Sequence, residues 1–201
     1  MTIFKYFDQP KFNDAAFYHD RPVSDHIHES GHRERLLRCL ADVAFLFDID
    51  KQSRSMTDLG CGNGGLMWEF SKRFPDSPTW GYELSPLAVQ YGKDHYRVDI
   101  THIDFVNALD DQLRFGDVIV MSEVLEHLID PVAMLKRLRG RSRWIVASCP
   151  SQEDDKQHYE FHLWAWDMGS FLRMFEKLGY QVILHYSTPL ISSQFLVAKN
   201  P

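Results

Sequence analysis

Cysteine is scarce in this sequence. The chain has three cysteines in 201 residues, at positions 39, 61 and 149, and no two of them form a C-x-x-C pair. Thiols so few and so widely spaced exclude a disulfide framework. Because free cysteines are typical of reducing compartments, we expect a cytoplasmic location.

Long hydrophobic runs are also missing. The longest run, 43–47, is far too short to span a membrane. Near the N-terminus, Asp8 and Asp14 interrupt the aromatic residues, and there is no apolar segment typical of a signal peptide. We therefore expect no association with a membrane and no secretion.

A surplus of positive charge is absent as well. Lysine and arginine together number 22 and aspartate and glutamate 28, which gives a formal net charge of −6. Proteins that bind nucleic acids nonspecifically normally carry a basic face. The charge therefore argues against a nucleic-acid partner, and the basic run 136–143 is expected to be the solvated end of a helix.

The sequence lacks repeats, low-complexity tracts and linkers, and its length suits one domain. Its 44% hydrophobic and 25% charged residues are typical of globular proteins. Residues 1–29 are aromatic and irregular, and Pro10 and Pro22 oppose any long element there. This N-terminal arm would either pack on the core or act as a lid, whereas residues 30–201 are expected to form the domain.

Strand and helix patterns alternate from residue 55 onward. The first expected strand ends at 58–60. The other six cover 79–83, 103–106, 117–121, 143–148, 181–186 and 194–198. The expected helices cover 30–47, 63–74, 131–140 and 168–178, with one more starting at Ser85-Pro86. This alternation predicts an α/β fold with a doubly wound, mainly parallel, seven-stranded sheet. Its last two strands would form an antiparallel hairpin.

The most informative stretch joins the first of these strands to a helix, and it reads Asp58-Leu59-Gly60-Cys61-Gly62-Asn63-Gly64. With Gly65 it also satisfies G-x-G-x-x-G, a dinucleotide fingerprint, which keeps an NAD-dependent oxidoreductase open as an alternative. Asp58 argues against that alternative, because a carboxylate beside the loop would repel a pyrophosphate. A carboxylate at this place suits a ligand that carries positive charge.

The same stretch resembles the first motif of the class I S-adenosylmethionine (SAM)-dependent methyltransferases, an acidic residue followed by x-G-x-G-x-G. The resemblance implies a Rossmann-like fold over about residues 30–200, with SAM as the cofactor. SAM carries an ammonium and a sulfonium group, so it meets the requirement for a positively charged ligand that Asp58 imposes.

In a doubly wound sheet, ligands bind beyond the carboxyl ends of the strands. The residues expected to bind the cofactor are therefore Asp58, Gly60, Cys61, Gly62, Glu83, Leu84, Asn107, Ala108 and Ser122. Glu83 lies about 20 residues after the glycines, where an acid can hold the ribose hydroxyls. The resemblance further implies that Asn107 bonds the adenine amino group and that Arg33 or Arg35 reaches the cofactor carboxylate.

A second motif follows the expected strand 117–121. Glu123, Glu126 and His127 have the spacing i, i+3 and i+4, so on a helical turn they would share one face. In one interpretation, His127 is a general base with an ordinary pKa of about 6.5. In another, the three residues hold Mg²⁺ or Mn²⁺ together with His158 or His162, and the metal acidifies an acceptor oxygen. In the third, the segment only packs a helix.

This second motif resembles that of small-molecule methyltransferases of the ubiquinone-biosynthesis type. Small-RNA 3′-terminal 2′-O-methyltransferases also use Glu-x-x-Glu-His to bind metal. The resemblance implies methyl transfer to an oxygen or nitrogen of a small-molecule acceptor. Methylation of an RNA 3′ end and SAM binding without catalysis are the alternatives. Trp164 and Trp166 would line the acceptor pocket or anchor the next helix, and neither the acceptor nor the oligomeric state follows from the sequence.

Overall fold

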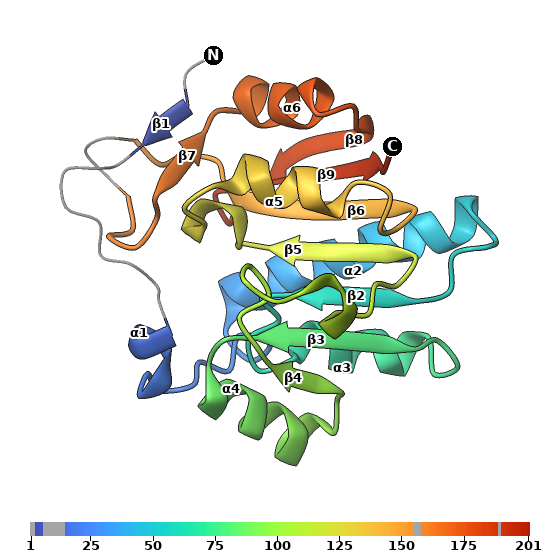
Figure 1. The fold of residues 1–201 in the computed structure, drawn as a ribbon, viewed down its shortest axis with the longest axis vertical. Coiled ribbons are helices and arrows are strands. Elements are labelled where there is room, and N and C mark those ends of the chain that lie inside the picture. The colour runs from blue at the N-terminus through green and yellow to red at the C-terminus, as the bar shows by residue number, and fades with distance from the viewer. Residues whose placement is uncertain (1–2, 6–14, 155–157, 189) are drawn as a thin grey trace.

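A computed structural model describes residues 3–5, 15–154, 158–188 and 190–201. Its main element is a seven-stranded sheet with helices on both faces (Figure 1). The strands are β2 (Met56–Leu59), β3 (Thr79–Glu83), β4 (Ile100–His102), β5 (Val118–Ser122), β6 (Trp144–Pro150), β8 (Gln181–Thr188) and β9 (Ser193–Lys199). The main helices are α2 (Ser30–Ile49), α3 (Gly65–Arg73), α4 (Pro86–Tyr91), α5 (Pro131–Leu138) and α6 (Met168–Lys177).

The strands lie in the order β4-β3-β2-β5-β6-β9-β8. The first five in this order are mutually parallel, and β9 runs antiparallel to both β6 and β8. The doubly wound sheet with a C-terminal antiparallel hairpin is therefore confirmed. After β2 the chain adds β3 and β4 on one side of this strand and then crosses to add β5 on its other side. A ligand crevice is therefore expected at the carboxyl ends of β2 and β5.

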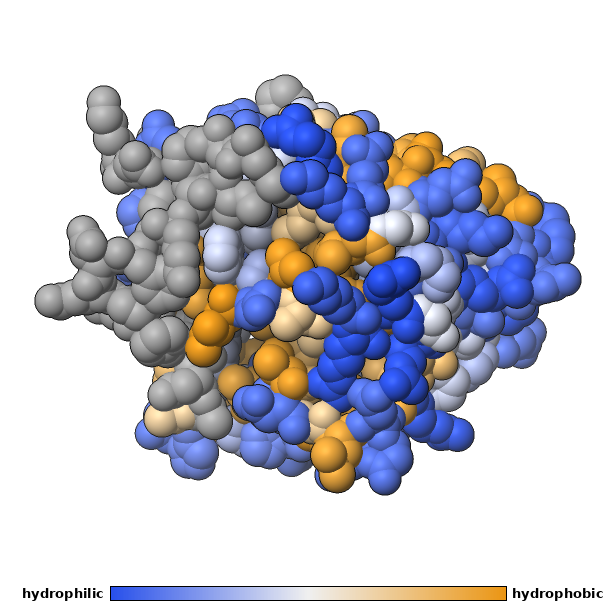
Figure 2. All heavy atoms as spheres, turned by 45° about the horizontal axis from the view of Figure 1, so that its top comes forward, coloured by the Kyte–Doolittle hydropathy of each residue, from blue (hydrophilic) through white to orange (hydrophobic). Residues whose placement is uncertain are grey.

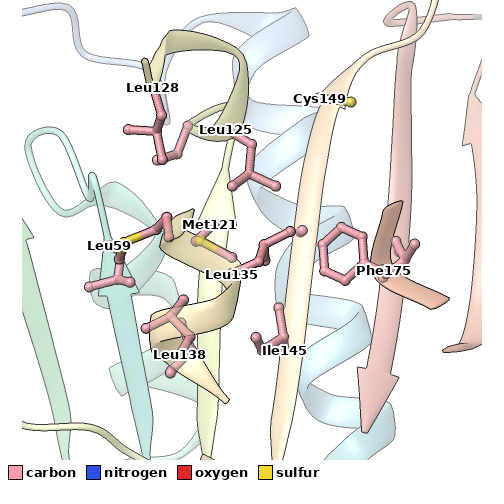
Figure 3. Packing of buried hydrophobic residues seen from close by; sticks show 14 of the residues in the cluster. Leu59, Met121, Leu125, Leu128, Leu135, Leu138, Ile145, Cys149 and Phe175 are labelled. Atoms are coloured by element: carbon pink, nitrogen blue, oxygen red, sulfur yellow. The ribbon is translucent and has the colours of Figure 1, made fainter. Parts of the chain in front are cut away.

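Two hydrophobic cores lie on opposite faces of the sheet. Along β5, Ile119 and Met121 contact one core and Val118 and Val120 the other, as the two-residue period of a strand requires. Helices α5 and α6 cover the first face, and α2 and α3 cover the second (Figure 1). Figure 3 shows how side chains of α5 meet those of the strands, and Leu135 is fully buried there. Both faces are therefore closed, and only the edges of the sheet remain for a site.

The strand expected at 103–106 is wrong, because β4 ends at His102. Phe105 is buried in the core, but its backbone belongs to a turn. The guanidinium of Arg137 donates to the carbonyl oxygens of Phe105, Val106 and Ala108 at 2.6–3.0 Å. A side chain therefore satisfies the carbonyls that a neighbouring strand would otherwise bind.

Three short elements were not expected, two in the N-terminal arm and one in a late loop. Strand β1 (Ile3–Lys5) pairs antiparallel with β7 (Trp164–Trp166), and helix α1 (Ala15–His19) follows β1. Strands of three residues are too short to show a periodic pattern. Their pairing places the beginning of the described chain beside the segment that follows β6 (Figure 1).

The surface is mostly hydrophilic on the face that Figure 2 shows. Outside the grey residues, the hydrophobic side chains on this face lie in separate small groups rather than in one broad patch. None of the helices within the described ranges is long and apolar enough to cross a membrane.

Candidate active site

The glycine-rich stretch forms a tight turn at the carboxyl end of β2. Gly60, Gly62 and Gly64 have φ angles of 73°, 55° and 78°, in the left-handed region that glycine adopts without strain. A Cβ atom on Gly60 would lie only 2.7 Å from Cγ2 of Val124. The loop therefore packs directly against the segment that carries the second motif.

Glu83 fastens this loop to the end of β3. Its Oε2 accepts a hydrogen bond from the backbone N–H of Gly62, and its Oε1 accepts from those of Leu84 and Ser85, each at 2.8 Å. A carboxylate offers about four acceptor positions, so hydroxyl groups of a ligand can still bond to Glu83. Burial raises the pKa of this carboxyl group.

Asp58 is buried at the end of β2, with 3% of its surface exposed. Burial, and next to it the charge of Glu83, raises the pKa of Asp58 to about 8. A positively charged ligand would offset both effects. Cys61 completes the turn, with its Sγ 3.7 Å from the carbonyl oxygen of Gly62.

The remaining residues expected to bind the cofactor differ in position. Ser122 ends β5, and its Oγ lies 3.2 Å from that of Ser148. Asn107 lies beyond the end of β4 in the turn described above, where its amide donates to Asp104 at 2.8 Å, and Ala108 packs against the core beside it. His102 is the last residue of β4, and its Nε2 lies 3.0 Å from the carbonyl oxygen of Leu84, the residue after β3. Sequence reasoning missed His102 because it misplaced the strand.

Of the two candidate arginines, Arg35 faces the site and Arg33 is exposed. Nη1 of Arg35 lies 3.5 Å from Oε2 of Glu123, and its Nε has no hydrogen-bond partner among the described residues. The Oγ of Ser193 donates to Oε1 of Glu123 at 3.2 Å. Arg35 is therefore the arginine that a cofactor or acceptor at this edge would meet.

The expected helical face of the second motif is wrong. Glu123 has a φ of 56°, outside any helix, and only Leu125–His127 form a short 3₁₀ helix, η3. Tertiary packing still brings the two acids together, since the charge of Glu123 adds to burial in raising the pKa of Glu126. The motif works through the fold around it rather than through helical spacing.

Glu126, His127 and His162 form a buried cluster, in which one ligand atom of each lies within 4.8 Å of the others. Glu126 is fully buried, and neither of its carboxylate oxygens has a hydrogen-bond partner in the described part of the chain. Nδ1 of His127 lies 3.1 Å from the carbonyl oxygen of Phe161, and Nδ1 of His162 lies 2.7 Å from Oε2 of Glu153. These acceptors favour the tautomers with hydrogen on Nδ1, so the lone pairs lie on Nε2.

The ordinary pKa expected for His127 is wrong. Burial, followed by the neighbouring His162, lowers the pKa of His127 to about 3. An imidazole of that pKa is a weak proton acceptor at neutral pH. The environment therefore opposes the role of general base that the sequence left open.

A second group of metal-type side chains lies at the start of α2 and comprises His26, Glu29 and His32. The ring of His26 stacks on that of His32, with centroids 4.4 Å apart. Burial, and after it the charge of Arg35, lowers the pKa of His32.

A pocket of about 600 Å³ opens beside the buried cluster. It is lined by Gly31, His32, Arg35, Glu123, Pro150, Gln152, Glu153, His158, Tyr159, His162, Leu190, Ile191, Ser192 and Ser193. Glu123 and His162 link it to the second motif, so an acceptor in this pocket would meet those side chains. Trp166 lies in the core with 2% exposed, and Trp164 donates from Nε1 to the carbonyl oxygen of Leu128 at 2.7 Å. Both anchor β7, and neither lines this pocket.

The strand order, the glycine turn after β2 and the acids at the ends of β2 and β3 are those of a class I methyltransferase fold. Residues 31–185 match the family described as methyltransferase domain, and the chain belongs to this family. It is therefore an enzyme of the SAM-dependent methyltransferase class, and the match gives no support to an NAD-dependent oxidoreductase. No curated protein matches the chain in sequence.

Solved structures share the fold at low sequence identity. Magnesium protoporphyrin IX methyltransferase (ChlM) from Synechocystis PCC 6803, crystallised with S-adenosylhomocysteine (SAH), is 16% identical with a TM-score of 0.68, covering 92% of each chain. The plantazolicin methyltransferase BpumL with SAH is 15% identical with a TM-score of 0.67, covering 93% of this chain and 94% of its own. The methyltransferase domain of bacterial CtHen1 is 22% identical with a TM-score of 0.63, covering 81% and 97%.

Proposed function

We propose that this chain transfers the methyl group of SAM to an oxygen or nitrogen of a small-molecule acceptor bound in the 600 Å³ pocket. The observation that carries the proposal is the position of the buried Glu126–His127–His162 cluster. Its segment contacts the glycine turn through Val124, and its member His162 and the nearby Glu123 line the pocket. Donor and acceptor would therefore meet at this cluster.

Each end of SAM has suitable partners at the carboxyl edge of the sheet. Asp58 would face its positive charge, Gly60, Cys61 and Gly62 would approach it through their backbone, and Glu83 would accept its ribose hydroxyls. Arg35 would bind its carboxylate. Leu84, Asn107, Ala108 and Ser122 would complete the site. The SAM or SAH bound to ChlM and BpumL supports this choice of cofactor.

The buried cluster fits a divalent cation such as Mg²⁺ or Mn²⁺. The carboxylate of Glu126 has no partner among the described residues, and the imidazoles of His127 and His162 each have a ligand atom within 4.8 Å of it. Glu153 and the carbonyl oxygen of Phe161 orient the two rings, as outer partners of metal-binding histidines do. Glu123 would be a fourth ligand. Such a cation would lower the pKa of an acceptor hydroxyl when bound.

The rest of the chemistry is positional. Methyl transfer from a sulfonium is an in-line displacement that removes a positive charge, so alignment in a dry pocket supplies much of the rate. Arg35 would hold Glu123 in place through their ion pair. Residues 15–29 of the N-terminal arm would serve as a lid over the crevice, whereas residues 1–2 and 6–14 of this arm lie outside the described residues. A location in the cytoplasm and a small-molecule acceptor of the ubiquinone-biosynthesis type belong to the same proposal.

Methylation of an RNA 3′ end is the second candidate. The Glu-x-x-Glu-His spacing of residues 123–127 favours it, and the net charge of −6 opposes it.

Isothermal titration tests the cofactor. We expect wild-type protein to bind SAM and not NAD, and Asp58→Asn to weaken SAM binding about tenfold or more, since hydrogen bonds to charged groups contribute about 1.5–3 kcal/mol. A protein that binds NAD in preference to SAM would overturn the proposal.

Titration with Mn²⁺, followed by the electron paramagnetic resonance of the free ion, tests the cluster. We expect one ion per chain, lost in His162→Gln and retained in the control His158→Gln, which changes a pocket residue outside the cluster. Equal Mn²⁺ binding by all three proteins would remove the cluster from the metal site.

A further inference from the structure

We propose that Asp25 is a positioning residue for methyl transfer, because it fastens the segment 15–29 to the glycine-rich loop and so makes this segment a strap that closes over the cofactor. The inference rests on the proposed function. The strap would retain the cofactor until an acceptor has reacted, a role that the second motif does not explain.

Asp25 holds the strap at one end. Its carboxylate accepts hydrogen bonds from the hydroxyls of Tyr91 (2.8 Å) and Tyr96, and from Nδ2 of Asn63 at 3.3 Å. The ring of Tyr96 in turn stacks on Trp68 of α3, with centroids 4.9 Å apart. Three donors, from α4, from the helical turn that follows it and from the glycine-rich loop, thus fix one carboxylate and anchor an otherwise irregular segment.

The partner Asn63 belongs to the glycine-rich loop itself. Its Oδ1 accepts from the backbone N–H of Gly65 at 3.2 Å, and its Nδ2 also donates to the carbonyl oxygen of Ser24 at 3.2 Å. Ile27, with 1% of its surface exposed, packs so closely on Gly65 that a Cβ atom added to this glycine would lie 3.0 Å from Cβ of Ile27. The strap and the loop that would hold the methyl donor are therefore one packed unit.

The other end of the strap contacts the loop beside the acceptor pocket. Nη2 of Arg21 donates to the hydroxyl of Tyr159 at 3.0 Å, and the ring of Phe17 lies 4.3 Å from that of Phe161, centroid to centroid. Arg21 also stacks over Phe17 at 4.9 Å. Since Tyr159 lines the pocket, these contacts form a latch between the strap and the acceptor side of the site.

Tyr18 belongs to the part of the strap that carries the latch, and its ring packs on that of Phe17 with centroids 5.1 Å apart. It is half-buried, and burial, followed by the charge of Glu83, raises the pKa of its hydroxyl. Because the anchor joins the strap to the glycine-rich loop and the latch joins it to the acceptor side, the cofactor could leave only after the latch opens. SAM must then bind before the acceptor, and SAH must leave after the methylated product.

The dissociation rate of SAH, measured without acceptor, tests the latch. We expect Arg21→Ala and Tyr159→Phe each to speed dissociation about fivefold, as the loss of one hydrogen bond predicts, and the double variant to be no faster than either. The control Arg33→Ala changes an exposed arginine of α2 and should match wild type. Unchanged dissociation in both latch variants would overturn the inference.

The SAM affinity of Asp25→Asn tests the anchor, with Asp94→Asn as a control, because Asp94 is exposed and accepts a hydrogen bond from Gln90. We expect about tenfold weaker SAM binding for Asp25→Asn, not additive with Asn63→Ala. A lower melting temperature with unchanged SAM affinity would make Asp25 merely structural. Failure of the wild type to bind SAM at all would instead overturn the proposed function.

Discussion

At the scale of single residues, the site gathers buried acids with few counter-charges among the described residues. Burial raises the pKa of Asp58, Glu83, Glu123 and Glu126, and within the described ranges only Glu123 of these four forms an ion pair with an arginine. Carboxylates are costly to bury in ionised form unless a cation or donors face them. Their arrangement therefore indicates that the working enzyme gains positive charge from its ligands.

Asp58 should make the ligand-free protein less stable as the pH rises. Its pKa is about 8 when folded against an ordinary 3.8, so between these values the folded protein keeps a proton that the unfolded chain loses. The favourable contribution is complete below pH 3.8 and falls by about 1.4 kcal/mol per pH unit until pH 8. Urea unfolding of Asp58→Asn between pH 5 and 8 should show a flatter pH dependence than wild type. Parallel curves would contradict the burial of a titrating Asp58.

At the scale of elements, Gln194 connects the main sheet to the segment beside the pocket. This side chain of β9 is fully buried, donates from Nε2 to the carbonyl oxygen of Trp166 at 2.8 Å, and has its Oε1 3.2 Å from Nε2 of His185. The bond to Trp166 attaches β7 to β9, and through β7 also β1. One amide thus steadies both strands of the small sheet.

Gln194→Ala should destabilise the protein by about 1–3 kcal/mol, because it leaves a buried carbonyl group without its donor. Chemical denaturation measures this loss, and Ser187→Ala on the exposed side of β8 is the control. We also expect Gln194→Ala to raise the KM for the acceptor more than the KM for SAM, because β7 lies on the acceptor side of the site. Equal stability of Gln194→Ala and wild type would show that the amide has no anchoring role.

Elements with a regular pattern or punctuation could be predicted from the sequence, and those governed by tertiary contacts could not. The glycine turn follows from local chemistry, because only glycine adopts its φ angles freely. The turn at 103–108 does not, because it depends on Arg137 from a distant helix. Likewise, the motif predicted that Glu126 and His127 lie together. The assumption of a helix misplaced Glu123. No local pattern distinguishes His162 from His158 as the third member of the cluster.

At the scale of the whole molecule, the basic run 136–143 is partly paired with acids. Arg137 and Arg141 both pair with Asp110, and Arg143 lies 2.7 Å from a carboxylate oxygen of Asp50. Two carboxylates thus reduce the positive charge of the run, in a chain whose net charge is already −6.

We accordingly expect no appreciable binding of a labelled single-stranded RNA at physiological salt, with a Kd weaker than about 100 µM, the weak end of nonspecific association. Fluorescence anisotropy at two salt concentrations measures this, and a basic RNA-binding protein serves as the positive control. Tight binding with a steep salt dependence would favour RNA as the acceptor.

The position of β9 has a consequence for how the protein is made. This strand comes last in the described chain, yet it lies between β6 and β8, and its residues from Ser193 to Ala198 are buried. Until residues up to Lys199 have left the ribosome, β6 exposes an unpaired edge that could recruit a strand from another chain. A nascent chain stalled before Ser193 should therefore be aggregation-prone and need a chaperone, however well its glycine loop and cofactor edge have formed.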